Sequence, residues 1–199
     1  MDLRSILAVP AAYRMWTNVV TGDTWRKHVA EYIRPKQGDR VLDMGCGPAD
    51  ILTYLPEVDY VGIDISEEYI AAARERFGSR GRFECKAVRD VAIDEPSSYD
   101  LVLSTGVVHH LDDDEAARLF ESARDALKPG GRLVTYDGCF VEGQSAVARR
   151  LLKMDRGQYV RTREAYTALA SKAFSDVKVH LRHDMLRIPY THIIMECTR

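Results

Sequence analysis

A glycine-rich turn between two strand-ending acids is the chemically most informative feature of this chain. Residues 41–50 have the sequence VLDMGCGPAD, an apolar run that ends in an acid and opens into a turn containing Gly45 and Gly47. Glycine has no side chain, so the backbone of such a turn can bend sharply and lie against a ligand. The next apolar run, residues 60–64, ends in a second acid, Asp64. Nucleotide-binding folds place a carboxylate about twenty residues beyond the first strand to bind a ribose.

The glycine pattern distinguishes between two cofactors. A dinucleotide site needs Gly-x-Gly-x-x-Gly, but Asp50 stands where the third glycine would be, and an acid in the first helical turn repels a pyrophosphate. A cofactor with a cationic sulfonium and an ammonium group meets no such repulsion. The run resembles the first motif of the class I S-adenosylmethionine (SAM)-dependent methyltransferases, whose usual form is Val-Leu-Asp-x-Gly-Cys-Gly followed by a small pair. The resemblance implies that S-adenosyl-L-methionine is the cofactor.

The resemblance also implies a set of cofactor contacts. The backbone of Gly45 and Gly47 is expected to approach the methionine part of SAM. Asp64 would bind the ribose hydroxyls, and Ile65 would pack on the adenine. Asp43 would orient the glycine turn or bind the ammonium group.

Two further cofactor contacts are expected at later strand ends. Ser104 ends the fourth expected strand at the same edge of the sheet. The end of the third strand departs from the family, because Ala87 stands where many relatives have an acid that binds the adenine amino group, and Asp90 comes three residues late. We expect the backbone of Val88, or the side chain of Arg89, to hold the adenine instead.

The pair His109 and His110 follows the fourth expected strand. The loop lacks the Asn/Asp-Pro-Pro-Tyr/Phe motif of methyltransferases that act on adenine or glutamine amino groups, and its His-His-Leu form resembles methyltransferases of small metabolites. A histidine here could serve as a general base, because its pKa suits neutral pH, or it could brace the loop. No metal site is expected, because adjacent histidines diverge and Asp112–Asp114 are explained as a helix cap.

The elements that position these residues alternate between strands and helices, and Ser66 is expected to cap the helix that follows the second strand. The expected parallel strands are residues 40–44, 60–64, 82–88, 99–104 and 132–137. Two late strands, residues 177–183 and 192–198, have no helix between them and indicate an antiparallel pair. This order predicts a single α/β domain over residues 1–199, a Rossmann-like, mostly parallel seven-stranded sheet with helices on both faces. Methyltransferases of the family named above end in such a strand pair.

Two segments are expected to cover the site. Residues 1–34 would form an N-terminal helical cover, in which Thr24 caps a helix. The aromatic and basic side chains of this segment would either contact the cofactor or fill the core: Tyr13, Arg14, Trp16 and Trp25. Residues 138–165 would form a substrate-lid insertion. Its basic side chains outnumber Glu142 and Asp155: Arg149, Arg150, Lys153, Arg156, Arg161 and Arg163. These cations would either receive an anionic substrate or keep a helix face in water.

The composition limits the functional classes. Hydrophobic residues make up 46% and charged residues 29% of the 199 residues, which is typical of a globular domain. The net charge of −2 gives no overall attraction to nucleic acid, so a nucleic-acid partner is not expected. The four scattered cysteines indicate a reduced, cytoplasmic protein, and neither a signal peptide nor a membrane span is expected. The oligomeric state stays open.

The leading hypothesis is a SAM-dependent methyltransferase that acts on a small-molecule metabolite, which would be anionic if the basic insertion binds it. One alternative is a catalytically silent SAM-binding partner in a larger assembly. A nicotinamide-dependent oxidoreductase is disfavoured by the glycine pattern and by the final strand pair.

Overall fold

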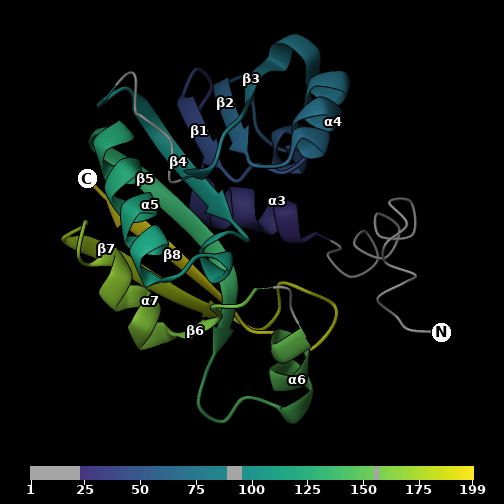
Figure 1. The fold of residues 1–199 in the computed structure, drawn as a ribbon, viewed down its shortest axis with the longest axis vertical. Helices are drawn as coiled ribbons and strands as arrows, with labels where there is room; N and C mark the ends of the chain where they lie inside the picture. The colour runs from purple at the N-terminus through teal and green to yellow at the C-terminus, as the bar shows by residue number, and fades with distance from the viewer. Residues whose placement is uncertain (1–22, 89–95, 155–156) are drawn as a thin grey trace.

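The computed structural model describes residues 23–88, 96–154 and 157–199 (Figure 1). Several residues singled out in the sequence lie outside these ranges: Tyr13, Arg14, Trp16, Arg89, Asp90, Asp155 and Arg156.

The centre of the fold is one mixed β-sheet. Its strands are β1 (Arg40–Met44), β2 (Asp59–Asp64), β3 (Gly81–Cys85), β4 (Tyr99–Thr105), β5 (Leu127–Phe140), β6 (Arg161–Thr162), β7 (Asp176–Arg182) and β8 (His192–Thr198). The order across the sheet is β3-β2-β1-β4-β5-β8-β7, and the short β6 pairs with the end of β5. The strands β1 to β5 run parallel, whereas β8 is antiparallel to both β5 and β7. The predicted fold class is therefore confirmed, including the C-terminal antiparallel pair.

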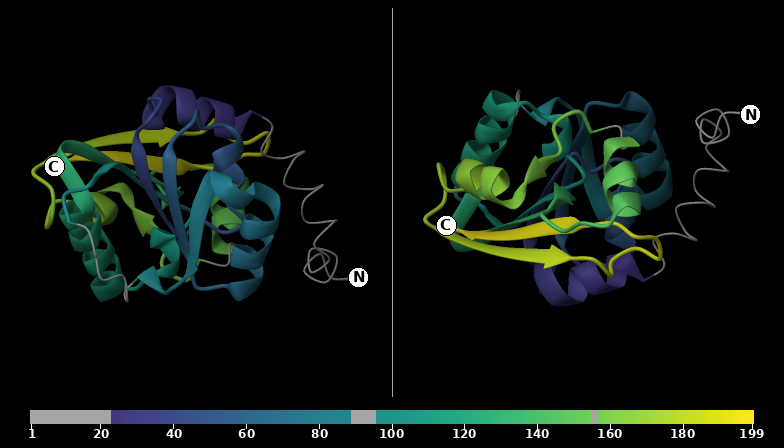
Figure 2. Two further views of the ribbon diagram at one scale, coloured as in Figure 1. Left: turned by 90° about the horizontal axis from the view of Figure 1, so that it is seen from above. Right: turned by 90° about the horizontal axis from the view of Figure 1, so that it is seen from below.

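Helices cover both faces of the sheet (Figure 2). The α-helices are α3 (Thr24–His28), α4 (Glu67–Phe77), α5 (Asp113–Ala126), α6 (Ala146–Met154) and α7 (Arg163–Ala170). A π-helical turn continues α3, and shorter 3-10 turns connect other elements: Val29–Ile33, Asp50–Thr53, Gly78–Arg80 and Val108–His110. At the β7–β8 end of the sheet, α3 lies on one face and α5 and α7 lie on the other. No helix in the described part of the chain is both long enough and apolar enough to cross a membrane.

The capping predictions have a mixed outcome. The side chains of Ser66 and Asp112 cap α4 and α5 by accepting from the backbone N–H of Tyr69 and Glu115. The prediction for Thr24 is wrong, because this residue lies inside the first turn of α3 and its hydroxyl donates to a distant backbone carbonyl.

Two strand boundaries also differ from the predictions. The third strand ends at Cys85 and not at Val88, because its only described partner, β2, ends at Asp64 opposite Cys85. The fifth strand is longer than predicted. Residues 128–131 form an irregularity between Leu127, which pairs with Tyr99, and the regular pairing that resumes at Arg132.

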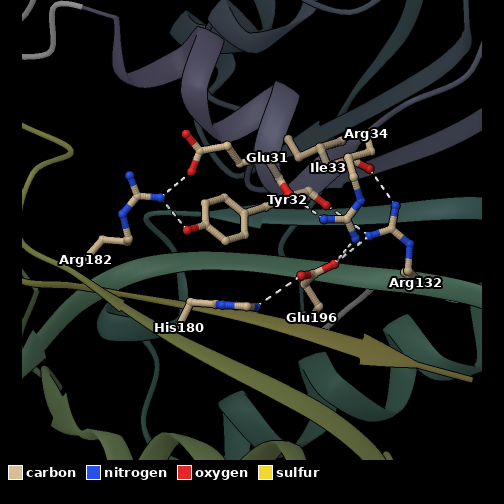
Figure 3. Close-up of polar contacts among 8 residues, drawn as sticks. All are labelled: Glu31, Tyr32, Ile33, Arg34, Arg132, His180, Arg182 and Glu196. Atoms are coloured by element: carbon tan, nitrogen blue, oxygen red, sulfur yellow. Dashed lines mark hydrogen bonds and ion pairs between the residues drawn. The ribbon is translucent and has the colours of Figure 1, made fainter.

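A cluster of charged side chains ties the segment after α3 to the outer strands (Figure 3). Glu196 on β8 accepts from Arg34 and, at 2.9 Å, from Arg132 on β5. Its other oxygen lies 3.1 Å from Nε2 of His180 on β7. Arg132 also donates to the backbone carbonyl of Ile33, at 2.6 Å. Because hydrogen bonds to charged groups are stronger than neutral ones, this cluster fixes the position of α3 over the sheet.

Candidate functional site

The glycine turn after β1 folds back onto β2. The backbone N–H groups of Gly45 and Cys46 donate to the carbonyl of Ile63, at 2.8 and 2.9 Å. Gly45 has a φ of +84° and Gly47 a φ of +54°, a region that favours glycine. The turn therefore has a left-handed backbone conformation at two positions, and glycine adopts this conformation without a steric penalty.

The two glycines face different surroundings. A Cβ atom on Gly45 would lie 2.4 Å from Cγ2 of Val107, so this glycine lets the turn pack against the loop after β4. A Cβ atom on Gly47 would meet no atom within 4 Å among the described residues. The open side of the turn is thus at Gly47, where a ligand can approach the backbone.

Asp64 joins the glycine turn to the start of α4. One carboxylate oxygen accepts from the backbone N–H of Gly47 and the other from that of Ser66, both at 2.9 Å. The residue is partly exposed, so remaining lone pairs on the carboxylate face solvent. Ile65 beside it is 73% exposed, an unusual position for a large apolar side chain and one that suits packing against a ring.

Asp43 and Ser104 bring buried polar atoms to the same edge. Asp43 is buried and accepts from the hydroxyl of Tyr60 at 2.6 Å. Its second oxygen and the hydroxyl of Ser104 have no hydrogen-bond partner among the described residues. Burial raises the pKa of Asp43 to about 7, because the charged form loses solvation. We call Asp43, Gly45, Gly47, Asp64 and Ser104 the cofactor edge.

Val88 is less clearly part of this edge. It lies beyond the end of β3 and packs, partly buried, against the core cluster that contains Val102 and Phe120. Its backbone stays a predicted adenine contact.

His109 is locked by an acid that the sequence reasoning did not single out. Its Nδ1 lies 2.7 Å from Oδ1 of Asp137, and the same oxygen accepts from the backbone N–H of His109 at 3.2 Å. Both residues are buried. One signal pointed to Asp137: like Asp43 and Asp64, it ends an apolar run that forms a parallel strand.

The segment after α6 covers His109. The backbone N–H of Tyr159 donates to the carbonyl of His109 at 2.9 Å, and a Cβ atom on Gly157 would lie 2.0 Å from the imidazole. His110 is exposed, and its ring centroid lies 4.2 Å from that of His109. Of the two predicted catalytic histidines, His109 is thus held inside the fold and His110 faces outward.

The basic insertion divides into internal and exposed cations. Arg161 is internal: it donates to the carbonyls of Val108 and Leu111, at 3.0 and 2.7 Å, and pairs with Asp113 at 2.8 Å. On α6 three cations are exposed: Arg149, Arg150 and Lys153. Figure 1 shows α6 beyond the carboxyl end of β5. Arg161 therefore braces the histidine loop, and the exposed charges gather on α6.

No group of three or more His, Cys, Asp or Glu side chains that could hold a metal ion occurs within residues 23–88, 96–154 and 157–199.

Comparisons with known proteins bear on the family and the fold of this domain. Residues 42–133 match the family described as "Methyltransferase domain". The solved structure of phosphoethanolamine N-methyltransferase 2 from Haemonchus contortus, in complex with phosphomonomethylethanolamine and S-adenosylhomocysteine, is similar with a TM-score of 0.66. The sequence identity is 25%, and the match covers 80% of this chain and 39% of that one. These matches identify residues 42–133 as a class I SAM-dependent methyltransferase domain.

Two curated methyltransferases are similar in sequence. Ubiquinone biosynthesis O-methyltransferase from Idiomarina loihiensis is 31% identical over 101 residues, which are 48% of this chain and 41% of that protein. Phosphoethanolamine N-methyltransferase from Triticum aestivum is 30% identical over 167 residues, 79% of this chain and 32% of that protein. This chain therefore spans less than half the length of either relative.

The cofactor of this methyltransferase domain is S-adenosyl-L-methionine. The residues present fit it. A cationic sulfonium and an ammonium group suit an edge with two carboxylates, and the unpartnered oxygen of Asp43 is an acceptor for an N–H donor. The open side of the turn at Gly47 leaves room for the ligand beside the Asp64 carboxylate.

Proposed function

We propose that this domain transfers the methyl group of SAM to a small-molecule acceptor. The observation that carries the proposal is the cofactor edge, where an open glycine turn, two carboxylates and a buried serine hydroxyl meet at the carboxyl ends of β1, β2 and β4. In open α/β sheets, ligands bind at this edge. When bound, SAM supplies a methyl group that a sulfonium already makes electrophilic. The chain must then align the acceptor and exclude water.

Each residue of the edge has a proposed role. The partly exposed carboxylate of Asp64 binds the ribose hydroxyls, with the exposed Ile65 and the backbone of Val88 on either side of the adenine. The free oxygen of Asp43 accepts from the ammonium group, and Gly45 and Gly47 line the methionine part with backbone.

The two histidines divide their work in this proposal. His109, bonded to Asp137 and covered by Gly157, is a positioning residue that fixes the loop after β4. The exposed His110, whose ring is tilted against that of His109, is the candidate general base for an acceptor that must lose a proton.

The acceptor is proposed to be a metabolite with an anionic group. The exposed cations Arg149 and Arg150 on α6 support this, because they lie beyond the carboxyl end of β5 and so on the side of the sheet where ligands bind. Of the relatives named above, one is an O-methyltransferase and the other is a phosphoethanolamine N-methyltransferase. The test therefore includes acceptors of both kinds.

Calorimetry and a methyl-transfer assay test the proposal. SAM should bind and NAD should not, and the protein should methylate either a hydroxyl-bearing metabolite or phosphoethanolamine. In His110→Ala, we expect the rate constant kcat to fall by about 100-fold and the acidic limb of the pH profile to disappear, with unchanged affinity for SAM. Failure to bind SAM would overturn the proposal.

The alternative is a catalytically silent SAM-binding partner. Two exposed apolar side chains on α6, Val147 and Met154, are the observation in its favour, because such side chains can form part of an interface. Binding of SAM without transfer to a panel of hydroxyl and amine metabolites would favour this alternative.

A further inference from the structure

A small cavity lies between α3 and the strands β5 and β8. Its volume is about 100 Å³, and its described lining consists of Thr24, Trp25, His28, Tyr136, Leu186 and His192. We call it the α3 cavity. The hydroxyl of Thr24 donates to the carbonyl of Met185, which fastens the start of α3 to the loop between β7 and β8. Together with the Glu196 contacts in Figure 3, this bond holds α3 in place over the cavity.

Flat rings dominate the lining. The ring of Tyr136 lies 4.9 Å from that of His28 and 4.4 Å from that of His192, measured between centroids. The Tyr136 and His192 rings are stacked, with 26° between their planes. Such surfaces favour a planar ligand, because aromatic groups stack or meet edge to face.

Buried polar atoms of His28 and Tyr136 in this cavity have no hydrogen-bond partner among the described residues. Both ring nitrogens of His28 and the hydroxyl of Tyr136 are buried without a hydrogen bond to any described residue. His28 as a whole is 1% exposed. Since buried polar groups in folded proteins are nearly always hydrogen-bonded, these atoms indicate a partner other than the described residues, and a bound ligand can supply it. The free oxygen of Asp43 and the hydroxyl of Ser104 show the same signature at the cofactor edge.

The charge state of the cavity selects the kind of partner. Burial lowers the pKa of His28 to about 4, so its imidazole is neutral and offers one donor and one acceptor. Burial raises the pKa of Tyr136 well above its usual range, so its hydroxyl stays protonated. No charged side chain occurs among the described residues that line the cavity, and an ion would lie there without a counter-charge. A neutral group that both donates and accepts, namely a hydroxyl, matches these atoms.

The cavity is next to the reacting edge of the domain. Tyr136 pairs with Thr105 at the end of β4, and its carbonyl accepts from the N–H of Gly106 at 2.7 Å. The cavity also approaches the basic helix α6. Gly138, two residues after Tyr136, faces Leu152 of α6 and Tyr190, whose ring lies 4.6 Å from that of His192.

We propose that the α3 cavity is the specificity pocket for the methyl acceptor and binds an uncharged, planar, hydroxyl-bearing group such as a phenol. His28 and Tyr136 bind the hydroxyl, and the rings around them contact the plane. A volume of 100 Å³ equals that of about three water molecules, so the pocket takes the hydroxyl-bearing edge of the acceptor. The remainder of the acceptor extends toward α6. This inference rests on the proposed function, and it adds to it that the acceptor carries a planar, hydroxyl-bearing group.

Phenol and toluene are suitable probes, because they have the same shape and differ in the hydroxyl. Their binding is measured directly by ligand-observed NMR and by thermal shift, in the presence of S-adenosylhomocysteine. We expect phenol to bind about tenfold more tightly than toluene, the effect of about one hydrogen bond. Benzoate and benzylammonium, which carry charges, should bind more weakly than phenol.

Two tyrosine variants form a matched pair. Tyr136→Phe removes a hydroxyl that bonds to none of the described residues. The melting temperature Tm without probe should therefore stay the same or rise, and the preference for phenol should disappear. Tyr166→Phe removes a buried hydroxyl that donates to the carbonyl of Gly138 at 3.0 Å and does not line the cavity. It should lower Tm and leave the preference for phenol intact. His28→Phe should also lose the preference for phenol. If His28→Phe does not fold, the result for Tyr136→Phe alone tests the inference.

The outcomes separate this inference from the proposed function. SAM binding together with equal affinity for phenol and toluene, or a preference that survives in Tyr136→Phe, overturns the inference alone. Binding of benzoate or benzylammonium as tight as that of phenol also overturns it. Loss of SAM binding overturns the proposed function, while the preference for phenol is still measurable, because it requires no methyl transfer.

Discussion

The cofactor edge and the α3 cavity stand at the same end of the sheet but hold their polar groups in opposite ways. At the cofactor edge, Asp64 is bonded to two backbone N–H groups, one of them 17 residues away at Gly47. In the α3 cavity, His28, Tyr136 and His192 come from three separate elements, and polar atoms of the first two have no hydrogen-bond partner in the described part of the chain.

This difference separates what is fixed from what can vary. A backbone-built turn tolerates few substitutions, because its shape depends on positive φ angles and close packing. A cavity lined by side chains can change its ligand through one residue without disturbing the sheet. The domain thus combines a rigid place for the cofactor with an adjustable place for the acceptor.

The largest expected effect tests the rigidity of the turn. Gly45→Val should abolish SAM binding, because its Cβ would lie 2.4 Å from Val107 and its φ is +84°. Gly47→Ala is the matched control for folding. Its Cβ meets no described atom within 4 Å, so only the positive φ opposes the substitution, at a cost of about 1–2 kcal/mol. Calorimetry and circular dichroism measure binding and folding.

The Gly47→Ala variant also reports on the ligand. If SAM passes over the open side of the turn, this variant should lose SAM affinity although it folds. A folded Gly47→Ala protein with normal affinity would place the cofactor elsewhere.

A smaller effect is expected at Asp64. Asp64→Ala should weaken SAM binding by about 10- to 100-fold, because a hydrogen bond to a charged group is worth about 1.5–3 kcal/mol. Asp64→Asn keeps one oxygen that can accept from a backbone N–H group of Gly47 or Ser66, and this variant should lose less SAM affinity than Asp64→Ala. Unchanged titration calorimetry on folded Asp64→Ala would remove this residue from the site.

A pH effect is expected at Asp43. Its pKa of about 7 is raised above the ordinary value of 3.8, so the folded protein binds an extra proton between these values. Stability of the cofactor-free protein should therefore fall as pH rises from 4 to 7. SAM affinity should change in the other direction, because the ammonium group favours the carboxylate, and should rise by about fivefold from pH 6 to pH 7.

Asp43→Asn is the control for both trends. The amide does not titrate, so this variant should lose the pH dependence that Asp43 contributes. Thermal melts and calorimetry across pH 5.5–7.5 make the measurement, and an Asn variant that keeps both slopes would contradict the assignment.

The smallest effect concerns the exposed charges of α6. Arg149→Glu combined with Arg150→Glu should raise KM for an anionic acceptor about threefold, a surface-charge effect, and leave SAM affinity unchanged. The change should fade as salt rises, since screening acts beyond about 8 Å at physiological ionic strength. Arg118→Glu combined with Arg124→Glu, two exposed positions on α5, is the matched double charge reversal outside the insertion. An equal response of both variants would show an effect of net charge only.

The parts of the fold that were predictable have local causes. The glycine turn, the acid-ended strands and the caps at Ser66 and Asp112 depend on neighbours a few residues away. The cofactor edge draws on the same local signals, and therefore its residues could be named from the sequence.

The rest depends on long-range packing that no local pattern encodes. Asp137 meets His109 across 28 positions, and the α3 cavity joins His28 to His192. The sequence left two roles open for His109, a general base or a residue that braces the loop. The contact with Asp137 favours the second role, and no local pattern predicts that contact. Thr24 illustrates the same limit, because its hydroxyl bonds to Met185, 161 positions away, and not to its own helix.

The position of β8 also sets the order in which the domain can be completed. Among the described strands β8 is the last in chain order, yet it lies between β5 and β7. In the described sheet, β7 is joined to β5 only through β8. A growing chain therefore finishes the cofactor edge while β5 still has an open hydrogen-bonding side. An open strand edge is a template for pairing with other chains. Substitutions that delay the docking of β8 should then reduce the yield of folded protein through aggregation, even where the finished enzyme would bind SAM normally.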